Sequence, residues 1–268
     1  MSCIKLLSIN FAPKNNLLKT KIRVGAVSYL NTKPLIYGFA QGMMHNEIDL
    51  VIDYPSNIAL MLMENKIDVG LIPVAVIPQL KEHYIISRYC IGCDGEVGSV
   101  CLFSDVPLQS IKKILLDYQS STSVELLKIL LNEYWKIDPV IEMTSSDDYT
   151  NDIKGTTAGL VIGDRALAQR KKSTYIFDLG LEWKKFTGLP FVFAAWVSNK
   201  KLDENFINSF NEANSKGLQN LPEIVAQNPF ELFDLNAYFS SYINYFFDEK
   251  KETGMKLFLQ KLHAEIPL

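Results

Sequence analysis

Hydroxyl and amide side chains gather in the stretch S-Y-L-N-T-K at residues 28–33. An apolar run, Ile22–Val27, precedes this stretch and predicts a strand, and Pro34 follows it at a position that suits the first turn of a helix. Asn31 and Thr32 are therefore expected in a strand-to-helix turn, and ligands of open α/β sheets bind at this end of the strands. The turn is a candidate ligand site, although a plain capped turn has the same pattern.

A second hydroxyl-rich turn, S-S-T-S at residues 120–123, precedes an amphipathic helix predicted over residues 124–135. Hydroxyl groups cap the free N–H groups of a helix start, and the positive end of the helix dipole favours an anion there. A carboxylate or a phosphate would therefore be held at this turn. Ordinary N-capping without a ligand is the alternative interpretation.

Four single residues add candidate contacts. Ser99 could donate a hydrogen bond, but it lacks the G-x-S-x-G elbow of serine hydrolases and has no obvious His partner. Ser56 and Asp164 each lie at the start of a predicted helix, where Asp164 either caps that helix or faces a ligand. Phe191 belongs to an aromatic segment that could stack on a flat ligand or pack in the core.

Motifs for cofactor chemistry are absent from the sequence. There is no P-loop, no G-x-G-x-x-G and no cluster with metal-ligand spacing, so we expect no cofactor. The C-x-x-C at residues 90–93 lies in a strand-like, glycine-rich segment, which favours structural cysteines over a zinc or redox site.

Composition limits the partners of the chain. A net charge of −3 predicts no nucleic-acid surface, and no apolar run approaches the ~20 residues of a membrane span. Lys5 interrupts the short apolar run near the N-terminus, which argues against a signal peptide and predicts a cytoplasmic protein. Nothing in the sequence indicates an oligomeric state.

The order of the predicted elements sets the fold class. Residues 21–80 follow the pattern β-α-β-α-β with short links, which predicts a parallel sheet. Two strand-like runs at 84–93 and 98–103 then form a hairpin or a chain crossing. A second β-α series ends in an apolar strand at 190–197, and the last third is helical, with one helix expected over 229–245.

This order predicts an α/β protein of two lobes, with a discontinuous first lobe and a C-terminal helical segment. The first lobe would comprise residues 21–103 and 197–268, the second lobe residues 104–196, and residues 1–20 would form an N-terminal extension. A cleft between the lobes would bring the carboxyl ends of both sets of strands together. Residues 180–187, polar and aromatic, receive no helix or strand.

Several segments together resemble the chorismate dehydratase family, which opens the futalosine route to menaquinone. The segments are S-Y-L-N-T-K-P-L (28–35), D-V-G-L-I-P-V-A (68–75), G-S-V-C-L-F-S (98–104), S-S-T-S-V-E-L-L (120–127), V-I-G-D-R-A-L (161–167) and E-W-K-K-F-T-G-L-P-F-V-F-A-A-W (182–196). The resemblance implies the type II periplasmic-binding-protein fold, which agrees with the two-lobe organisation.

The resemblance also implies a reaction, the loss of water from chorismate to give 3-[(1-carboxyvinyl)oxy]benzoate, and catalytic importance for Asn31 and Ser99. Because an amide and a hydroxyl are poor bases at neutral pH, our hypothesis is that the substrate's own enolpyruvyl carboxylate removes the C3 proton. The substrate contacts that we expect are Ser28, Thr32, Ser56, Ser121, Thr122, Ser123, Asp164 and Phe191.

Two alternatives stand beside this interpretation. The first is 1,4-dihydroxy-6-naphthoate synthase, a family of the same pathway and fold that has an I-H-E-type turn with a His base. This chain has Ile162-Gly163-Asp164 at that turn, and the missing His argues against the alternative. The second is a non-catalytic protein that binds a small carboxylate, which a secretion signal or lipobox would favour.

Overall fold

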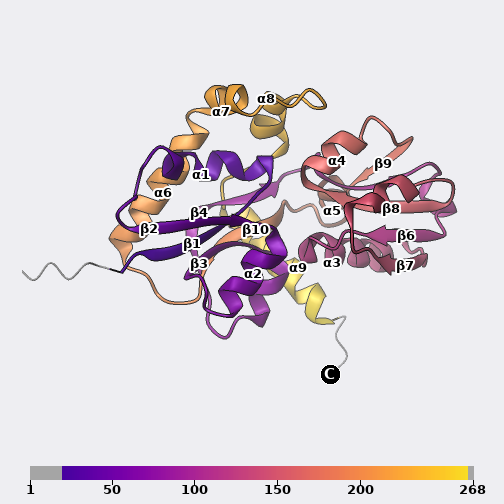
Figure 1. The fold of residues 1–268 in the computed structure, drawn as a ribbon. Helices are drawn as coiled ribbons and strands as arrows, with labels where there is room; N and C mark the ends of the chain where they lie inside the picture. The colour runs from indigo at the N-terminus through magenta and orange to yellow at the C-terminus, as the bar shows by residue number, and fades with distance from the viewer. Residues whose placement is uncertain (1–19, 265–268) are drawn as a thin grey trace, which may run out of the picture.

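The computed structural model describes residues 20–264, so the predicted extension at residues 1–20 lies outside it apart from Thr20. Two five-stranded sheets form two lobes that lie side by side (Figure 1). The first sheet consists of β1 (Ile22–Val27), β2 (Ile48–Asp53), β3 (Val69–Pro73), β4 (Tyr84–Cys93) and β10 (Phe191–Ser198). The second sheet consists of β5 (Val100–Ser104), β6 (Lys113–Leu116), β7 (Val140–Met143), β8 (Thr157–Ile162) and β9 (Tyr175–Asp178). The predicted two-lobed α/β architecture is confirmed.

The two sheets share one topology. In the first, the order is β2-β1-β3-β10-β4, with β1 parallel to β2 and β3 and with β10 antiparallel to both of its neighbours. In the second, the order is β7-β6-β8-β5-β9, with β6 parallel to its neighbours and β5 antiparallel to its own. Each sheet therefore holds three parallel strands and an antiparallel strand inserted beside them.

The two antiparallel insertions are the points where the chain changes lobe. The runs at 84–93 and 98–103 are a chain crossing and not a hairpin, because β4 pairs with β10 whereas β5 pairs with β8 and β9. The predicted boundaries at 103/104 and 196/197 fall inside β5 and β10. By sheet membership, residues 100–103 belong with the second lobe and residues 191–196 with the first.

Helices cover the faces of both sheets. The helices are α1 (Lys33–Ala40), α2 (Pro55–Met63), α3 (Ser121–Ile129), α4 (Gly163–Gln169), α5 (Leu179–Thr187), α6 (Glu204–Leu218), α7 (Leu221–Gln227), α8 (Leu235–Ala237) and α9 (Glu249–Ala264). Short 3-10 segments lie at Leu30–Thr32, Val74–Gln79, Leu108–Ser110 and Asp147–Asp152, and π-helical turns at Leu130–Trp135 and Tyr238–Tyr242. Within residues 20–264, no helix is both long and apolar enough to cross a membrane.

Two helices differ from the sequence prediction. Residues 179–187 form α5, because the Asp178 carboxylate accepts hydrogen bonds from the N–H groups of Gly180 and Leu181 at the helix start. The single helix expected over 229–245 is wrong. A proline follows Asn228 and disfavours helical backbone there, and helix resumes only after Asp234, whose carboxylate caps α8.

The C-terminal helices are pressed onto the first lobe at α1, the helix that follows the Asn31 turn. The helices α1 and α6 approach so closely that a Cβ atom at Gly38 would lie 2.3 Å from the carbonyl oxygen of Ala213. At Gly217 it would lie 1.8 Å from the carbonyl oxygen of Pro34. Only glycine permits this approach, so the start of α1 is held by α6.

The cysteines described by the structure are buried free thiols. Cys90 and Cys93 lie in β4, and Cys101 lies in β5. Burial raises the pKa of the Cys90 thiol to about 12, so it stays protonated at neutral pH. This environment agrees with structural cysteines.

Asp68 ties together the strands at the base of the first sheet. Its carboxylate accepts hydrogen bonds from the backbone N–H of Arg23 (2.9 Å), from the Arg23 guanidinium (3.0 Å) and from the Lys200 ammonium (2.8 Å). Burial alone would raise the pKa of Asp68, but the hydrogen bonds from Arg23 and Lys200 outweigh burial and hold this pKa well below its ordinary value. Asp68 therefore stabilises the folded state in its ionised form.

The variant Asp68→Asn should lower the free energy of unfolding at pH 7 by about 1.5–3 kcal/mol, the range for hydrogen bonds to a charged group. Because folding lowers the pKa of Asp68, this contribution is complete above the unfolded-state pKa of about 3.9 and is lost as pH falls below it. Urea denaturation at pH 7 and pH 3 should show the difference between the two proteins shrinking. The control Asp49→Asn, at an exposed pair with Lys21, should change stability by less than about 1 kcal/mol. A difference that does not vary with pH would contradict this role.

Candidate active site

A narrow cleft separates the two lobes at the carboxyl ends of β1, β3, β6 and β8. Its lining consists of Val27, Tyr29, Asn31, Pro55, Pro73, Ile91, Phe193 and Ala194 from the first lobe, and Ser99, Val100, Ser120, Ser123, Ile162 and Gly163 from the second. Most of these side chains are apolar, with an amide and hydroxyl groups between them. The cleft volume is about 50 Å³, far below the roughly 300–1,000 Å³ of typical ligand pockets. A ring-sized ligand therefore enters only when the lobes move apart.

Asn31 lies in the 3-10 turn between β1 and α1 and is only 7% exposed. Its backbone carbonyl accepts a hydrogen bond from the hydroxyl of Tyr245 (2.9 Å). Thr32 is fully buried beside it and donates to the Asn31 side-chain oxygen across 3.4 Å. These contacts hold the turn in place, and Asn31 remains in the lining of the cleft.

Ser99 lies directly before β5, where the chain enters the second lobe. It is fully buried, its backbone carbonyl accepts from the N–H of Gly163 (2.8 Å), and its hydroxyl oxygen accepts from the hydroxyl of Tyr238 (2.7 Å). The preceding residue, Gly98, has a φ of +74° and its N–H donates to the Asp178 carboxylate (2.7 Å). Asp178 therefore holds the unusual backbone turn that presents Ser99.

The hydroxyl-rich turn at the start of α3 also reaches the cleft. Ser120 caps the helix, because its hydroxyl oxygen accepts from the N–H of Ser123 (3.2 Å), and it donates to the Ser123 hydroxyl (2.8 Å). Ser120 and Ser123 line the cleft, whereas Ser121 lies in an adjoining outer pocket of about 740 Å³. The turn thus offers a hydroxyl and free helix N–H groups to an anion.

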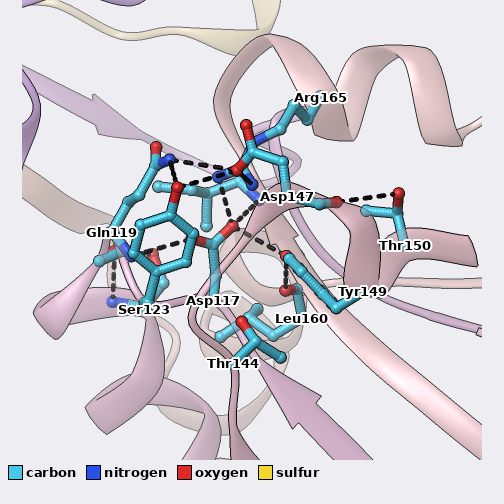
Figure 2. Close-up of polar contacts among 12 residues, drawn as sticks. Asp117, Gln119, Ser123, Thr144, Asp147, Tyr149, Thr150, Leu160 and Arg165 are labelled. Atoms are coloured by element: carbon cyan, nitrogen blue, oxygen red, sulfur yellow. Dashed lines mark hydrogen bonds and ion pairs between the residues drawn. The ribbon is translucent and has the colours of Figure 1, made fainter. Parts of the chain in front are cut away.

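A buried carboxylate, Asp117, holds that turn in place (Figure 2). It accepts hydrogen bonds from the backbone N–H groups of Gln119 (3.0 Å) and Ile162 (3.3 Å). It also accepts from the Tyr149 hydroxyl (2.9 Å) and the Arg165 guanidinium (2.8 Å). The network connects the end of β6, the end of β8 and the start of α4, so it fixes the second-lobe wall of the cleft.

Three hydrogen bonds join the lobes across the cleft. The Tyr29 hydroxyl donates to the side-chain oxygen of Gln119. The N–H of Leu30 donates to Asp164 (3.1 Å). The N–H of Ala75 donates to the Thr122 hydroxyl (3.2 Å). Each bond joins a turn of one lobe to a turn or helix start of the other. These bonds therefore form when the two lobes are closed against each other.

Asp164 does not cap its own helix, because its carboxylate is used on the Leu30 N–H of the other lobe. Burial raises the pKa of Asp164 above its ordinary value, and the Leu30 hydrogen bond and the charge of Lys33 oppose that rise. The residue therefore positions the Asn31 turn against the second lobe.

The structure brings some of the predicted site residues together and separates others. Those that line the cleft are Asn31, Ser99 and Ser123, and those beside it are Thr32, Ser121, Thr122 and Asp164. Ser28 and Ser56 are exposed outside the cleft lining. Phe191 is fully buried against Trp183 and Phe258, and its neighbour on the same strand, Phe193, lines the cleft instead.

Sequence reasoning missed several participants. Tyr29 lies in the S-Y-L-N-T-K stretch at residues 28–33, so its position next to Asn31 could have indicated that it reaches the cleft. Tyr238 and Tyr245 contact Ser99 and Asn31 from 139 and 214 residues away, and no local pattern indicates this. Across residues 20–264, no group of His, Cys, Asp and Glu side chains could hold a metal ion.

A model of the family described as menaquinone biosynthesis matches residues 22–264. The chain belongs to this family. Chorismate dehydratase of Thermus thermophilus is 28% identical over 196 residues, which cover 63% of this chain and 69% of that protein.

Solved structures agree on the fold. A protein of Archaeoglobus fulgidus has a TM-score of 0.72 at 16% identity and covers 91% of this chain and 97% of its own. The aliphatic sulphonate-binding protein SsuA of Escherichia coli has a TM-score of 0.60 at 12% identity, covering 91% of this chain and 87% of its own. A Candida albicans protein with the generic periplasmic-binding-protein fold reaches 0.60 at 11% identity, covering 92% of each chain. The menaquinone-family chain therefore has the periplasmic-binding-protein fold.

The variant Tyr29→Phe should shift the ligand-free protein toward an open arrangement, because it removes a hydrogen bond that joins the lobes across the cleft. A bond worth about 0.5–1.5 kcal/mol changes an open-to-closed ratio roughly 2- to 13-fold. Small-angle X-ray scattering should report a larger radius of gyration. The control Tyr118→Phe removes a hydroxyl that bonds Gln119 and Asp147 within the second lobe, and should leave the radius unchanged. Equal radii for both variants would contradict the contribution of Tyr29 to closure.

Proposed function

We propose that the protein is a chorismate dehydratase that converts chorismate to 3-[(1-carboxyvinyl)oxy]benzoate and water. The observation that carries the proposal is the meeting of Asn31 and Ser99 at one cleft, from different lobes, in a chain of the menaquinone family. The name of the Thermus thermophilus relative supports the same reaction. The enzyme would act as a carbon–oxygen lyase.

The lining of the cleft suits this substrate in shape and polarity. Apolar side chains such as Ile91, Ile162 and Phe193 provide walls for a flat six-membered ring. Chorismate also carries two carboxylates, and the Ser120–Ser123 turn offers hydroxyl and N–H donors at the positive end of α3. We assign one substrate carboxylate to this turn.

The lining supports a proton transfer within the substrate. Among the described residues that line the cleft, none is a His, Cys, Lys, Asp or Glu. Tyr29 is there, but burial and the charge of Asp117 raise its pKa, so its hydroxyl stays protonated. In our proposal the enolpyruvyl carboxylate of chorismate takes the C3 proton as the C4 hydroxyl leaves.

The protein would supply orientation and electrostatic stabilisation. Loss of the C3 proton and the C4 hydroxyl makes the ring aromatic, so the products are strongly favoured and the barrier depends on geometry. Neutral donors at Asn31 and Ser99 would stabilise the leaving hydroxide and the enolpyruvyl group. Such donors contribute most in a water-excluded site, a condition that the lobes would provide by closing around the bound substrate.

The turn at Gly163 disfavours the naphthoate synthase alternative. Gly163 has a φ of +63°, and a Cβ atom there would lie 3.0 Å from the Tyr29 ring. A histidine base at this position would require a different backbone and a displaced Tyr29.

Chorismate incubated with the protein should lose its cyclohexadiene absorbance and give a product lighter by one water in mass spectrometry. The variants Asn31→Ala and Ser99→Ala should lower kcat by about 10²–10³-fold, the range for one donor to developing negative charge. Unchanged chorismate that is nevertheless bound would support a carboxylate-binding protein. Normal turnover by both variants would refute the assignment of these residues.

The variant Asp164→Asn distinguishes proton removal by the substrate's own carboxylate from proton removal by an enzyme side chain. An amide oxygen can still accept from the Leu30 N–H but cannot remove a proton, so substrate-assisted chemistry predicts a kcat within about 10-fold of wild type. The wild-type kcat should also be independent of pH between 6 and 9. A loss of activity of about 10⁴-fold in Asp164→Asn would identify Asp164 as the base.

A further inference from the structure

A buried phenol lies behind both candidate catalytic groups. Tyr238 is fully buried, and its hydroxyl donates to the hydroxyl oxygen of Ser99 over 2.7 Å. The side chain of Asn31 lies close enough to the same hydroxyl to lower its pKa. Tyr238 is therefore bonded to the hydroxyl at the entry to the second lobe and neighbours the amide contributed by the first.

The direction of this hydrogen bond determines what Ser99 can offer to a ligand. Because Tyr238 donates its proton to the Ser99 oxygen, the serine proton cannot point back toward Tyr238. Ser99 lines the cleft, so its own proton is available to a ligand there. Successive hydrogen bonds that run in one direction polarise each other, which strengthens Ser99 as a donor.

The environment of Tyr238 keeps it a donor. Burial raises the pKa of the phenol, and the hydrogen bonds with Ser99 and Asn31 only partly oppose the rise. The hydroxyl therefore stays protonated at every pH at which the protein would work. It cannot serve as a base.

The backbone around Tyr238 is fixed against the chain crossing. Tyr238 begins a π-helical turn, Tyr238–Tyr242, a rare geometry that recurs at functional sites. The ring of Tyr242, at the other end of this turn, packs on Gly98, directly before Ser99. Phe233 lies edge-on to both tyrosine rings. The phenol is thus held in register with Ser99.

We propose that Tyr238 is a positioning residue whose hydroxyl orients Ser99 as a hydrogen-bond donor toward the substrate and holds the Asn31 amide beside it. The identity of the substrate, chorismate, rests on the proposed function. Tyr238 does not line the cleft, so it acts on the substrate through Ser99 and Asn31.

A double-mutant cycle with chorismate tests the proposal. The variant Tyr238→Phe keeps the ring and its packing, and its kcat should fall about 10- to 100-fold while KM changes less than about 3-fold. Because Tyr238 acts largely through Ser99, adding Tyr238→Phe to Ser99→Ala should lower kcat by less than about 3-fold more. The control Tyr37→Phe removes the hydroxyl of another largely buried tyrosine, which interacts with Glu223 away from the cleft, and should leave kcat unchanged.

A binding measurement keeps the test independent of turnover. Isothermal titration with benzoate should show about 3- to 10-fold weaker binding for Tyr238→Phe and for Ser99→Ala, and no further loss when both are present. If the wild type leaves chorismate unchanged but this pattern holds, the proposed function fails and the role of Tyr238 stands. The inference would be overturned if Tyr238→Phe had the wild-type kcat or if the kcat losses of the two single variants multiplied in the double variant. Unchanged benzoate affinity in Tyr238→Phe would also overturn it.

Discussion

The insertion of β10 between β3 and β4 is the constraint on which the rest of the molecule depends. It returns the chain from the second lobe into the middle of the first sheet, so everything after Ser198 must pack around a core that already exists. The helix α6 does so by pressing onto α1 through Gly38 and Gly217. The chain then comes back to the crossing, where Tyr238 reaches Ser99. The segment after Ser198 therefore contacts the candidate site and does not only cover the first sheet.

Charged side chains surround the cleft, but none belongs to the part of its lining that the structure describes. Asp117 and Asp178 are buried, and each is surrounded by backbone N–H groups that it holds in place. Arg165 and Arg170 partly neutralise them. The residues that would meet the ligand, Asn31 among them, are neutral. This arrangement fits the proton transfer proposed above, because the buried carboxylates hold the donors in place while no basic side chain in the described lining competes for the proton.

Local pattern was sufficient to predict the parallel β-α units, the two lobes and the two turns that carry Asn31 and Ser120. Hydroxyl groups before a helix and an apolar run before a turn are short-range signals, and both predicted turns are found in the structure. Pattern was insufficient wherever long-range packing decides. Phe193 lies at the cleft, whereas Phe191 packs in the core against Trp183 and Phe258. An apolar run does not predict which of two neighbouring aromatic residues makes such long-range contacts. Tyr238 is selected by tertiary contact alone.

Closure and binding use the same groups. The turn that carries Asn31 also provides Tyr29 and the Leu30 N–H to the second lobe, and the α3 turn that would hold a carboxylate also provides Thr122 to the first. In the closed arrangement the cleft has almost no free volume. A ligand between the lobes must therefore replace some of these contacts with its own, and its affinity is the difference between the two sets. Because each hydrogen bond across the cleft has a modest net strength, a ligand can replace these contacts without a large cost in free energy.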